Sequence, residues 1–166
     1  MIKHSLLSTA LSIILFGCGD NIKQTATNAD SLEITQYNKD QRNKAIALKC
    51  IDAYAANDIA YILSQNANDV VNIYAGQPPI RGIDSCRLAL REAFKIIKEY
   101  KPSNQLAVAD SNYVVVYQYV DISLRKSDET LHNKSVELFK FNDEGKIIVH
   151  TGVNEALEPN DVKISF

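Results

Sequence analysis

The chain has 166 residues, of which 46% are hydrophobic and 23% are charged, and its formal net charge is −2. This composition is typical of a globular protein, and the length suits one domain. The sequence contains no basic cluster interleaved with aromatic residues, so we expect no nucleic-acid partner.

The start of the chain has the pattern of a secretory signal. Lys3 precedes an apolar run without charge, residues 6–16, which as a helix would rise about 16 Å and could not cross a hydrocarbon core of about 30 Å. The run ends in "LFGC" (15–18), which resembles a bacterial lipobox, where the cysteine is lipidated after cleavage. We therefore expect residues 1–17 to be a lipoprotein signal peptide and Cys18 to carry palmitate or a similar lipid. A plain signal peptide with an incidental cysteine is the alternative.

The segment after Cys18 is rich in Asn, Asp, Gln, Thr and Ser. It has little apolar surface to offset the entropy lost on ordering, so residues 18–40 are predicted to be a lipidated cysteine followed by a flexible tether. This order predicts a bacterial cell-envelope protein anchored to a membrane by its lipid. Gly19 is not acidic, which by analogy with lipoprotein sorting favours the outer membrane, with the domain facing the periplasm.

Residues 41–157 are predicted to form the folded domain, and residues 158–166 a C-terminal tail. Helical spacing of apolar residues begins near Asp40 and runs to Ala55, and "ANDIAYILS" restarts a short helix. A β-rich run follows at 69–74, then the loop "AGQPPIRG" and a second long helix over 83–100, which Pro102 is expected to stop.

The C-terminal half is predicted to be an antiparallel meander. Its strands cover about 103–109, 112–125, 133–142 and 145–153, with "NDEG" as a hairpin turn. The strand at 112–125 is apolar on both faces, whereas a sheet covered on one side only is polar on the other. A second copy of the chain is therefore a candidate partner for the outer face, as a homodimer.

This order of elements resembles the nuclear transport factor 2-like superfamily over about residues 44–157. The stretches that carry the resemblance are "AANDIAYILSQNANDVV" (55–71), "GQPPIRG" (76–82) and "ELFKFNDEGKII" (137–148). The nearest branches are the SnoaL-like polyketide cyclases and the ketosteroid isomerases. The resemblance implies an α+β, cystatin-like cone in which a curved antiparallel sheet wraps around helices and leaves a small-molecule pocket at its open end.

The resemblance also locates three chemical roles of the ketosteroid isomerases. The carboxylate base falls at Tyr74 and the oxyanion-binding phenol falls at Cys50, whereas the protonated carboxylic acid matches Glu137. A thiol is a much weaker donor than a phenol. Steroid-type isomerisation is therefore not expected.

Two residues remain as a candidate acid–base pair. If Glu137 faces the interior, desolvation favours its neutral form, which can donate a hydrogen bond; on the other face it is a solvated carboxylate. His150 lies on the last strand, on the side that the resemblance assigns to the pocket, and beside Glu137 it could exchange protons near neutral pH. The alternative is a histidine satisfied by a single hydrogen bond.

Tyr54, Tyr74 and Tyr119 are candidate pocket walls, and ordinary core packing is the simpler explanation for each of them. Arg81 is a candidate for holding an anionic ligand at the rim, and a solvated loop arginine is the alternative.

The remaining cysteines, Cys50 and Cys86, form a possible disulfide or are two buried thiols. They lack the spacing of a zinc site, and no phosphate loop or dinucleotide motif is present in the sequence. We expect neither a metal nor a cofactor.

Three functions follow as hypotheses. The first is a lipid-anchored envelope protein whose cone binds a small, partly apolar ligand without catalysis. The second is an enzyme of the cyclase, isomerase or dehydratase type that uses Glu137 and His150. The third is a protein-interaction module that pairs through the outer face of the sheet, as a homodimer or with another envelope protein.

Overall fold

The computed structural model describes residues 19–158, 161 and 165. The chain divides into two compact units, Met1–Thr35 and Gln36–Phe166. The predicted signal peptide and Cys18 lie outside the described residues, so cleavage and lipidation stay predictions. Within the described part, no helix is both long and apolar enough to cross a membrane.

Helix α1 spans Gly19–Ala55 and so includes residues of the segment 18–40, whose role as a flexible tether stays a prediction. The helix sequence after Gly19 contains neither glycine nor proline, and most of its polar residues cost only a few tenths of a kcal/mol each in a helix. A helix of this polar composition therefore lacks an apolar face for packing on a core, but its residues still allow helix formation. The second unit begins at Gln36, and the predicted domain bounds, 41–157, stay a prediction.

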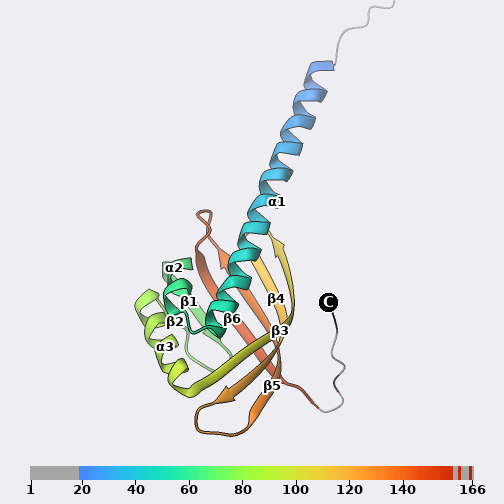
Figure 1. Cartoon of the computed structure of the whole chain (residues 1–166). Helices are drawn as coiled ribbons and strands as arrows, with labels where there is room; N and C mark the ends of the chain where they lie inside the picture. Colours follow the sequence, from blue (N-terminus) through green and yellow to red (C-terminus); the bar gives the residue numbers. More distant parts are fainter. Residues whose placement is uncertain (1–18, 159–160, 162–164, 166) are drawn as a thin grey trace, which may run out of the picture. The chain divides into compact units, whose positions relative to one another are not determined.

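In the second unit, residues 36–55 of α1 are followed by two helices and a six-stranded sheet (Figure 1). The elements are α2 (Ile59–Gln65), β1 (Asn66–Tyr74), β2 (Ile80–Arg81), α3 (Ile83–Ile96), β3 (Ile97–Asp110), β4 (Tyr113–Leu124), β5 (Thr130–Phe141) and β6 (Ile147–Ala156). The strand order is β2-β1-β6-β5-β4-β3. The predicted α+β fold with a curved sheet is confirmed, but the sheet is mixed, because β1 pairs with β6 in parallel.

The second long helix is shorter than predicted. It ends at Ile96, and residues 97–100 begin strand β3 instead. Tyr100 pairs with Ile122 and Pro102 with Val120 on β4. Pro102 is tolerated because β3 is an edge strand, where a missing backbone N–H leaves no gap in a ladder. Pairing with β4 therefore ends the helix before the proline does.

The core lies between one face of the sheet and the helices. Side chains from all three helices pack on inward residues of β1, β4, β5 and β6; the buried set is Ala47, Cys50, Ile51, Leu63, Val70, Cys86, Leu90, Val114, Val116, Phe139, Phe141 and Ile147. On β4 the inward positions alternate with Tyr113 and Val115, which point to the other face.

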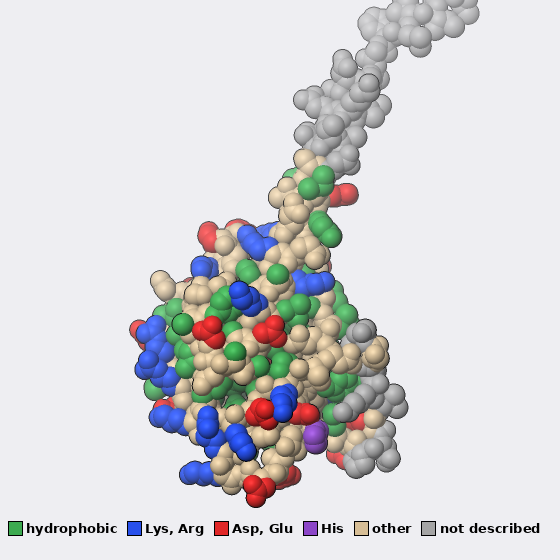
Figure 2. Space-filling view, viewed as in Figure 1, with side chains coloured by type: hydrophobic (Ala, Val, Ile, Leu, Met, Phe, Trp, Pro, Cys, Tyr) green, Lys and Arg blue, Asp and Glu red, His purple; other side chains and the backbone are tan. Residues whose placement is uncertain are grey.

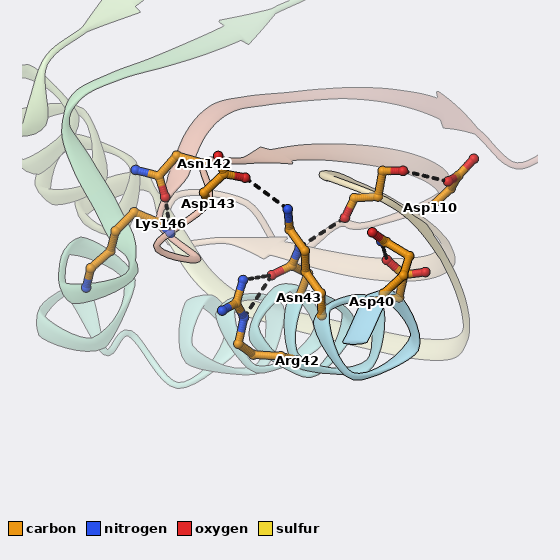
Figure 3. A network of polar contacts seen from close by, with 10 residues as sticks. Asp40, Arg42, Asn43, Asp110, Asn142, Asp143 and Lys146 are labelled. Atoms are coloured by element: carbon orange, nitrogen blue, oxygen red, sulfur yellow. Dashed lines mark hydrogen bonds and ion pairs between the residues drawn. The ribbon is translucent and has the colours of Figure 1, made fainter. Parts of the chain in front are cut away.

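A polar network fixes α1 to two turns of the sheet (Figure 3). Asn43 is fully buried, and its side-chain NH₂ donates to the carbonyl of Ser111 at 3.3 Å in the β3–β4 turn. Arg42 donates to the Asn43 side-chain oxygen at 3.2 and 3.1 Å. Lys39 forms an ion pair with Asp143 of the β5–β6 turn at 3.0 Å. These contacts set the position of the last turns of α1, which carry Cys50 and Tyr54, over the sheet.

The outer face of the sheet is substantially apolar, as the sequence predicts for residues 112–125. Val108, Val115, Val136 and Val153 are each between 38% and 59% exposed on this face, and their strands are adjacent. The homodimer expected from this pattern stays a prediction.

Candidate functional site

A cavity of about 420 Å³ opens between the helices and the inner face of the sheet. Its lining is mostly apolar, with side chains from α1, α2, α3 and all six strands. This is the size and character of a small-molecule site, in which a few placed polar groups set orientation. Glu137, His150, Tyr54 and Tyr74 all line it, as the sequence predicts for these four residues.

The structure brings Glu137 and His150 together. Glu137 is only 8% exposed; its Oε2 lies 3.0 Å from Nε2 of His150, and its Oε1 accepts a hydrogen bond from Ser135 at 2.7 Å. Both carboxyl oxygens are therefore engaged, as burial of a carboxyl group requires.

Strand register explains this arrangement. Glu137 on β5 lies opposite Gly152 on β6, and Phe139 lies opposite His150. A Cβ on Gly152 would overlap the Glu137 carboxyl group, lying 2.7 Å from its Cδ. Ser135 shares a face with Glu137 because the two are two residues apart on one strand. Glycine at position 152 thus leaves the notch that the carboxyl group fills.

The imidazole of His150 is held by aromatic rings. It stacks on Phe139 with ring centroids 4.5 Å apart and planes 12° apart, and Tyr74 meets it edge-on at 6.1 Å. Its Nε2 is bonded to Glu137, whereas Nδ1 has no hydrogen-bond partner among the described residues. The aromatic contacts fix the plane of the imidazole ring, and the hydrogen bond to Glu137 fixes its rotation within that plane. Nδ1 is left to interact with a ligand.

Three phenols surround the pair. Tyr54, Tyr74 and Tyr100 line the cavity, and burial raises the pKa of each hydroxyl, with the neighbouring Glu137 carboxylate raising it further. The Tyr100 oxygen accepts a hydrogen bond from Gln118 at 3.1 Å, which leaves its own proton to donate. These groups stay protonated near neutral pH and therefore act as donors.

The two cysteines also line the cavity, but the possible disulfide is not formed. Cys50 on α1 and Cys86 on α3 are both free and buried, each packed among apolar core residues. Burial raises the pKa of the Cys50 thiol to about 12 and also raises the pKa of Cys86. Neither is a thiolate near neutral pH, so neither is a reactive nucleophile.

Two residues that are predicted to belong to the pocket, Tyr119 and Arg81, do not line it. Tyr119 is buried but lies on the outer face of β4, in register with Lys134, because inward Gln118 and Val120 flank it. Arg81 is exposed on β2, where its neighbour Ile80 faces the cavity instead. Alternation along each strand sends both side chains away from the site.

No Lys or Arg is among the residues that line the cavity. Figure 2 shows Lys and Arg side chains gathered over α3 instead, where Arg91 and Lys95 are exposed. In the described part of the chain, no three His, Cys, Asp or Glu side chains gather in a way that could hold a metal ion. Among the residues that line the cavity, Glu137 is thus the one carboxylic acid and His150 the one imidazole.

Residues 47–150 match the family model of the SnoaL-like domain. The chain belongs to the SnoaL-like domain family. A search of curated proteins found no match.

Solved structures share this fold at low sequence identity. An NTF2-like protein from Burkholderia xenovorans LB400 superposes with a TM-score of 0.61 at 18% identity, covering 69% of this chain and 90% of that one. An LEH-like epoxide hydrolase from M. tuberculosis gives a TM-score of 0.61 at 15% identity, covering 69% of this chain and 84% of the other. At these identities the similarity establishes the nuclear transport factor 2-like fold of this SnoaL-like domain.

Several residues of the site in this SnoaL-like domain are not predicted from the sequence, among them Asn72, Tyr100, Ser135 and Gly152. The helix predicted over 83–100 includes Tyr100, whereas helix α3 ends at Ile96 and Tyr100 lies on β3. Asn72 and Ser135 carry a usable signal, since each is a polar residue on the inward face of a strand. Gly152 in the middle of a strand is a sign of close approach by another group.

We predict that Gly152→Ala destabilises the SnoaL-like domain by about 1–3 kcal/mol, because its methyl group displaces the Glu137 carboxyl group. Urea unfolding of the single variant measures this loss. In a Glu137→Ala background the same substitution should be nearly neutral, because the clash is gone.

Thr151→Val, on the opposite face of the same strand, is the control for Gly152→Ala and should change stability little. An equal loss for Gly152→Ala with and without the Glu137 side chain would show that the notch does not hold the carboxyl group.

Proposed function

We propose that this SnoaL-like domain binds a small, neutral, partly apolar molecule in its cavity and transfers a proton to or from it with the Glu137–His150 pair. The observation that carries the proposal is the 3.0 Å hydrogen bond between Glu137 Oε2 and His150 Nε2 inside the cavity. A carboxylate beside an imidazole is a common means of general acid–base catalysis near neutral pH.

In this proposal each residue of the site positions the next one through a hydrogen bond. Ser135 holds one oxygen of Glu137, and the other oxygen of Glu137 accepts the Nε2 proton of His150. That bond fixes the tautomer and leaves Nδ1 as the base, and the carboxylate stabilises the imidazolium formed when Nδ1 takes a proton. His150 is then the catalytic residue, and Glu137 and Ser135 are positioning residues.

The phenols supply the complementary part of the chemistry. Removing a proton from carbon beside a carbonyl places negative charge on the carbonyl oxygen, and preorganised donors stabilise that charge. Tyr54, Tyr74 and Tyr100 are protonated donors in the same cavity. The cavity therefore combines a base with oxyanion donors, although their positions differ from those that the isomerase resemblance implies.

A second candidate is non-catalytic binding. It is favoured by Tyr74 and Cys50, which stand where the isomerase resemblance requires a carboxylate base and a phenol donor. Under this alternative, Glu137 and His150 serve only to satisfy one another and to orient a ligand.

Exchange of carbon-bound protons separates these candidates. With 1-indanone as the probe in D₂O, we expect the domain to accelerate loss of the α-proton signal in the ¹H NMR spectrum. His150→Phe, which keeps an aromatic ring against Phe139, should lower the enhancement on the order of 10²-fold, because the base is gone.

Glu144→Gln, in the exposed β5–β6 turn, is the control and should exchange at the wild-type rate. Line broadening of 1-indanone in the same samples reports binding. Binding without exchange would leave the domain as a ligand-binding protein, and unchanged exchange in His150→Phe would contradict the assigned base.

We also propose that lipid on Cys18 anchors the mature protein to the bacterial outer membrane, with the folded domain facing the periplasm. The support is the lipobox-like "LFGC" after a short apolar run that begins behind Lys3. In a bacterial host grown with labelled palmitate, the wild-type protein should take up label and partition into detergent.

Cys18→Ala should abolish both the label and the partitioning, because only a cysteine at the cleavage site is lipidated. Cys50→Ala is the matched control and should keep both. Label retained by the Cys18→Ala variant would contradict the anchor.

A further inference from the structure

The solvent side of α3 carries a cluster of cations (Figure 2). Most of them lie along the helix or just after its end, and one comes from the β4–β5 turn. The set is Arg87, Arg91, Lys95, Lys98 and Arg125. Arg125 is adjacent because its backbone N–H donates to the carbonyl of Ile96 at 2.8 Å and its Nε donates to the carbonyl of Phe94 at 3.2 Å. The chain as a whole has a net charge of −2, so the cluster is a local feature.

Nearby carboxylates neutralise only part of this charge. Arg87 pairs with Asp84 at 3.7 Å and Lys95 pairs with Glu92 at 2.6 Å, and the side chains of both pairs are exposed. Exposed pairs of this kind contribute little, so their cations remain able to contact another anion. Arg91, which lies between these cations on the helix, has no ion-pair partner among the residues that the structure describes.

Large aliphatic side chains are exposed among these cations. Leu88 is 61% exposed and Ile96 is 59% exposed. Leu88 precedes Arg91 by three residues and Lys95 by seven, so the three side chains share one face of the helix. Leu90, on the opposite face, is buried. We call the five cations, together with Leu88 and Ile96, the α3 surface.

Helix stability explains only part of the α3 surface. The dipole favours cations at the C-terminus of a helix, which accounts for Lys95 and Arg125. It does not account for Arg87, in the N-terminal half, or for Arg91, in the middle. An exposed leucine by itself is ordinary. Cations that surround exposed aliphatic side chains on one helix face are typical of a helix that lies on a membrane surface.

We propose that the α3 surface docks on a phospholipid bilayer that contains anionic headgroups. Its cations contact the lipid phosphates, and Leu88 and Ile96 enter the boundary between headgroups and acyl chains. The inference rests neither on binding or catalysis in the cavity nor on lipid at Cys18. The opposite face of α3 lines the cavity, so docking brings the cavity to about one helix diameter, about 10 Å, from the bilayer.

Tryptophan fluorescence tests this placement, because the chain contains no tryptophan. In the full chain, Leu88→Trp places a reporter within the α3 surface, and Ile96→Trp is a second reporter if that variant does not fold. With vesicles of phosphatidylcholine and phosphatidylglycerol in equal parts, we expect the emission to shift to shorter wavelength, and brominated phosphatidylglycerol should quench it. Vesicles of phosphatidylcholine alone should do neither.

Val153→Trp, on the outer face of the sheet, where Val153 is 59% exposed, is the matched control and should not respond. Binding of vesicles by the apolar run at residues 6–16 alone would leave both reporters in water. The control therefore separates docking of the α3 surface from attachment by that run.

Removal of charge tests the electrostatic part. In the Leu88→Trp background, Arg91→Gln together with Lys95→Gln should weaken binding to the mixed vesicles on the order of tenfold or more, because each cation near an anionic surface contributes severalfold. Added NaCl should weaken binding as well. Lys140→Gln with Lys146→Gln, on β5 and in the β5–β6 turn, removes the same charge and should leave the titration unchanged. Arg91 and Lys95 are exposed, so the Tm should stay at the value of the background variant.

Each contrary result overturns the proposal. A reporter on α3 that does not respond to the mixed vesicles, or that responds equally to neutral ones, contradicts electrostatic docking. A titration that is unchanged without Arg91 and Lys95 shows that these cations do not make the contact. A response to polyglutamate but not to vesicles assigns the α3 surface to an acidic protein partner instead. The exchange of 1-indanone and the labelling of Cys18 are measured separately, so the proposed function stands or fails independently of these results.

Discussion

The site depends on one constraint: a carboxyl group buried inside an apolar cavity must have partners for both of its oxygens. Glu137 obtains them from Ser135 on its own strand and from His150 on the neighbouring strand. The space for the carboxyl group exists because Gly152, opposite it in the ladder, has no side chain. The Glu137–His150 pair thus depends on three features: the strand register, a glycine in the middle of β6 and a buried serine on β5.

The rest of the cavity complements this pair. Burial and the nearby carboxylate keep three phenols protonated, and burial keeps both thiols protonated. Basic residues remain outside, on the exposed side of α3 (Figure 2). The hydrogen-bond donors, the Glu137–His150 pair and a lining without Lys or Arg are the features on which we propose a neutral ligand.

The sequence was sufficient for the fold class, for most strands and for the Glu137–His150 pair. The pair is predictable from the sequence because alternation along β5 and β6 decides which side chains share a face. The family resemblance indicates which of the two faces is the inner one. Elements that depend on pairing with a distant segment could not be predicted from the local sequence. Residues 97–100 join β3 because they pair with β4, and Tyr100 lines the cavity because it lies on this strand. Tyr119 and Arg81 have side chains that suit a pocket chemically, but strand alternation points both away from the site. The prediction of a tether after Gly19 rests on polar composition, and composition does not show whether helix-breaking residues are absent.

The central claim, that His150 is bound to Glu137 within the folded domain, is tested most directly by the imidazole ¹⁵N resonances of His150. In the wild-type domain we expect its two nitrogens to report a single tautomer with the proton on Nε2, and Glu137→Gln should shift both resonances strongly. His132, which pairs with Asp121 on an exposed part of the sheet, is an internal reference that should not move. His150 resonances that are identical in the wild type and in Glu137→Gln would contradict the pair and the function built on it.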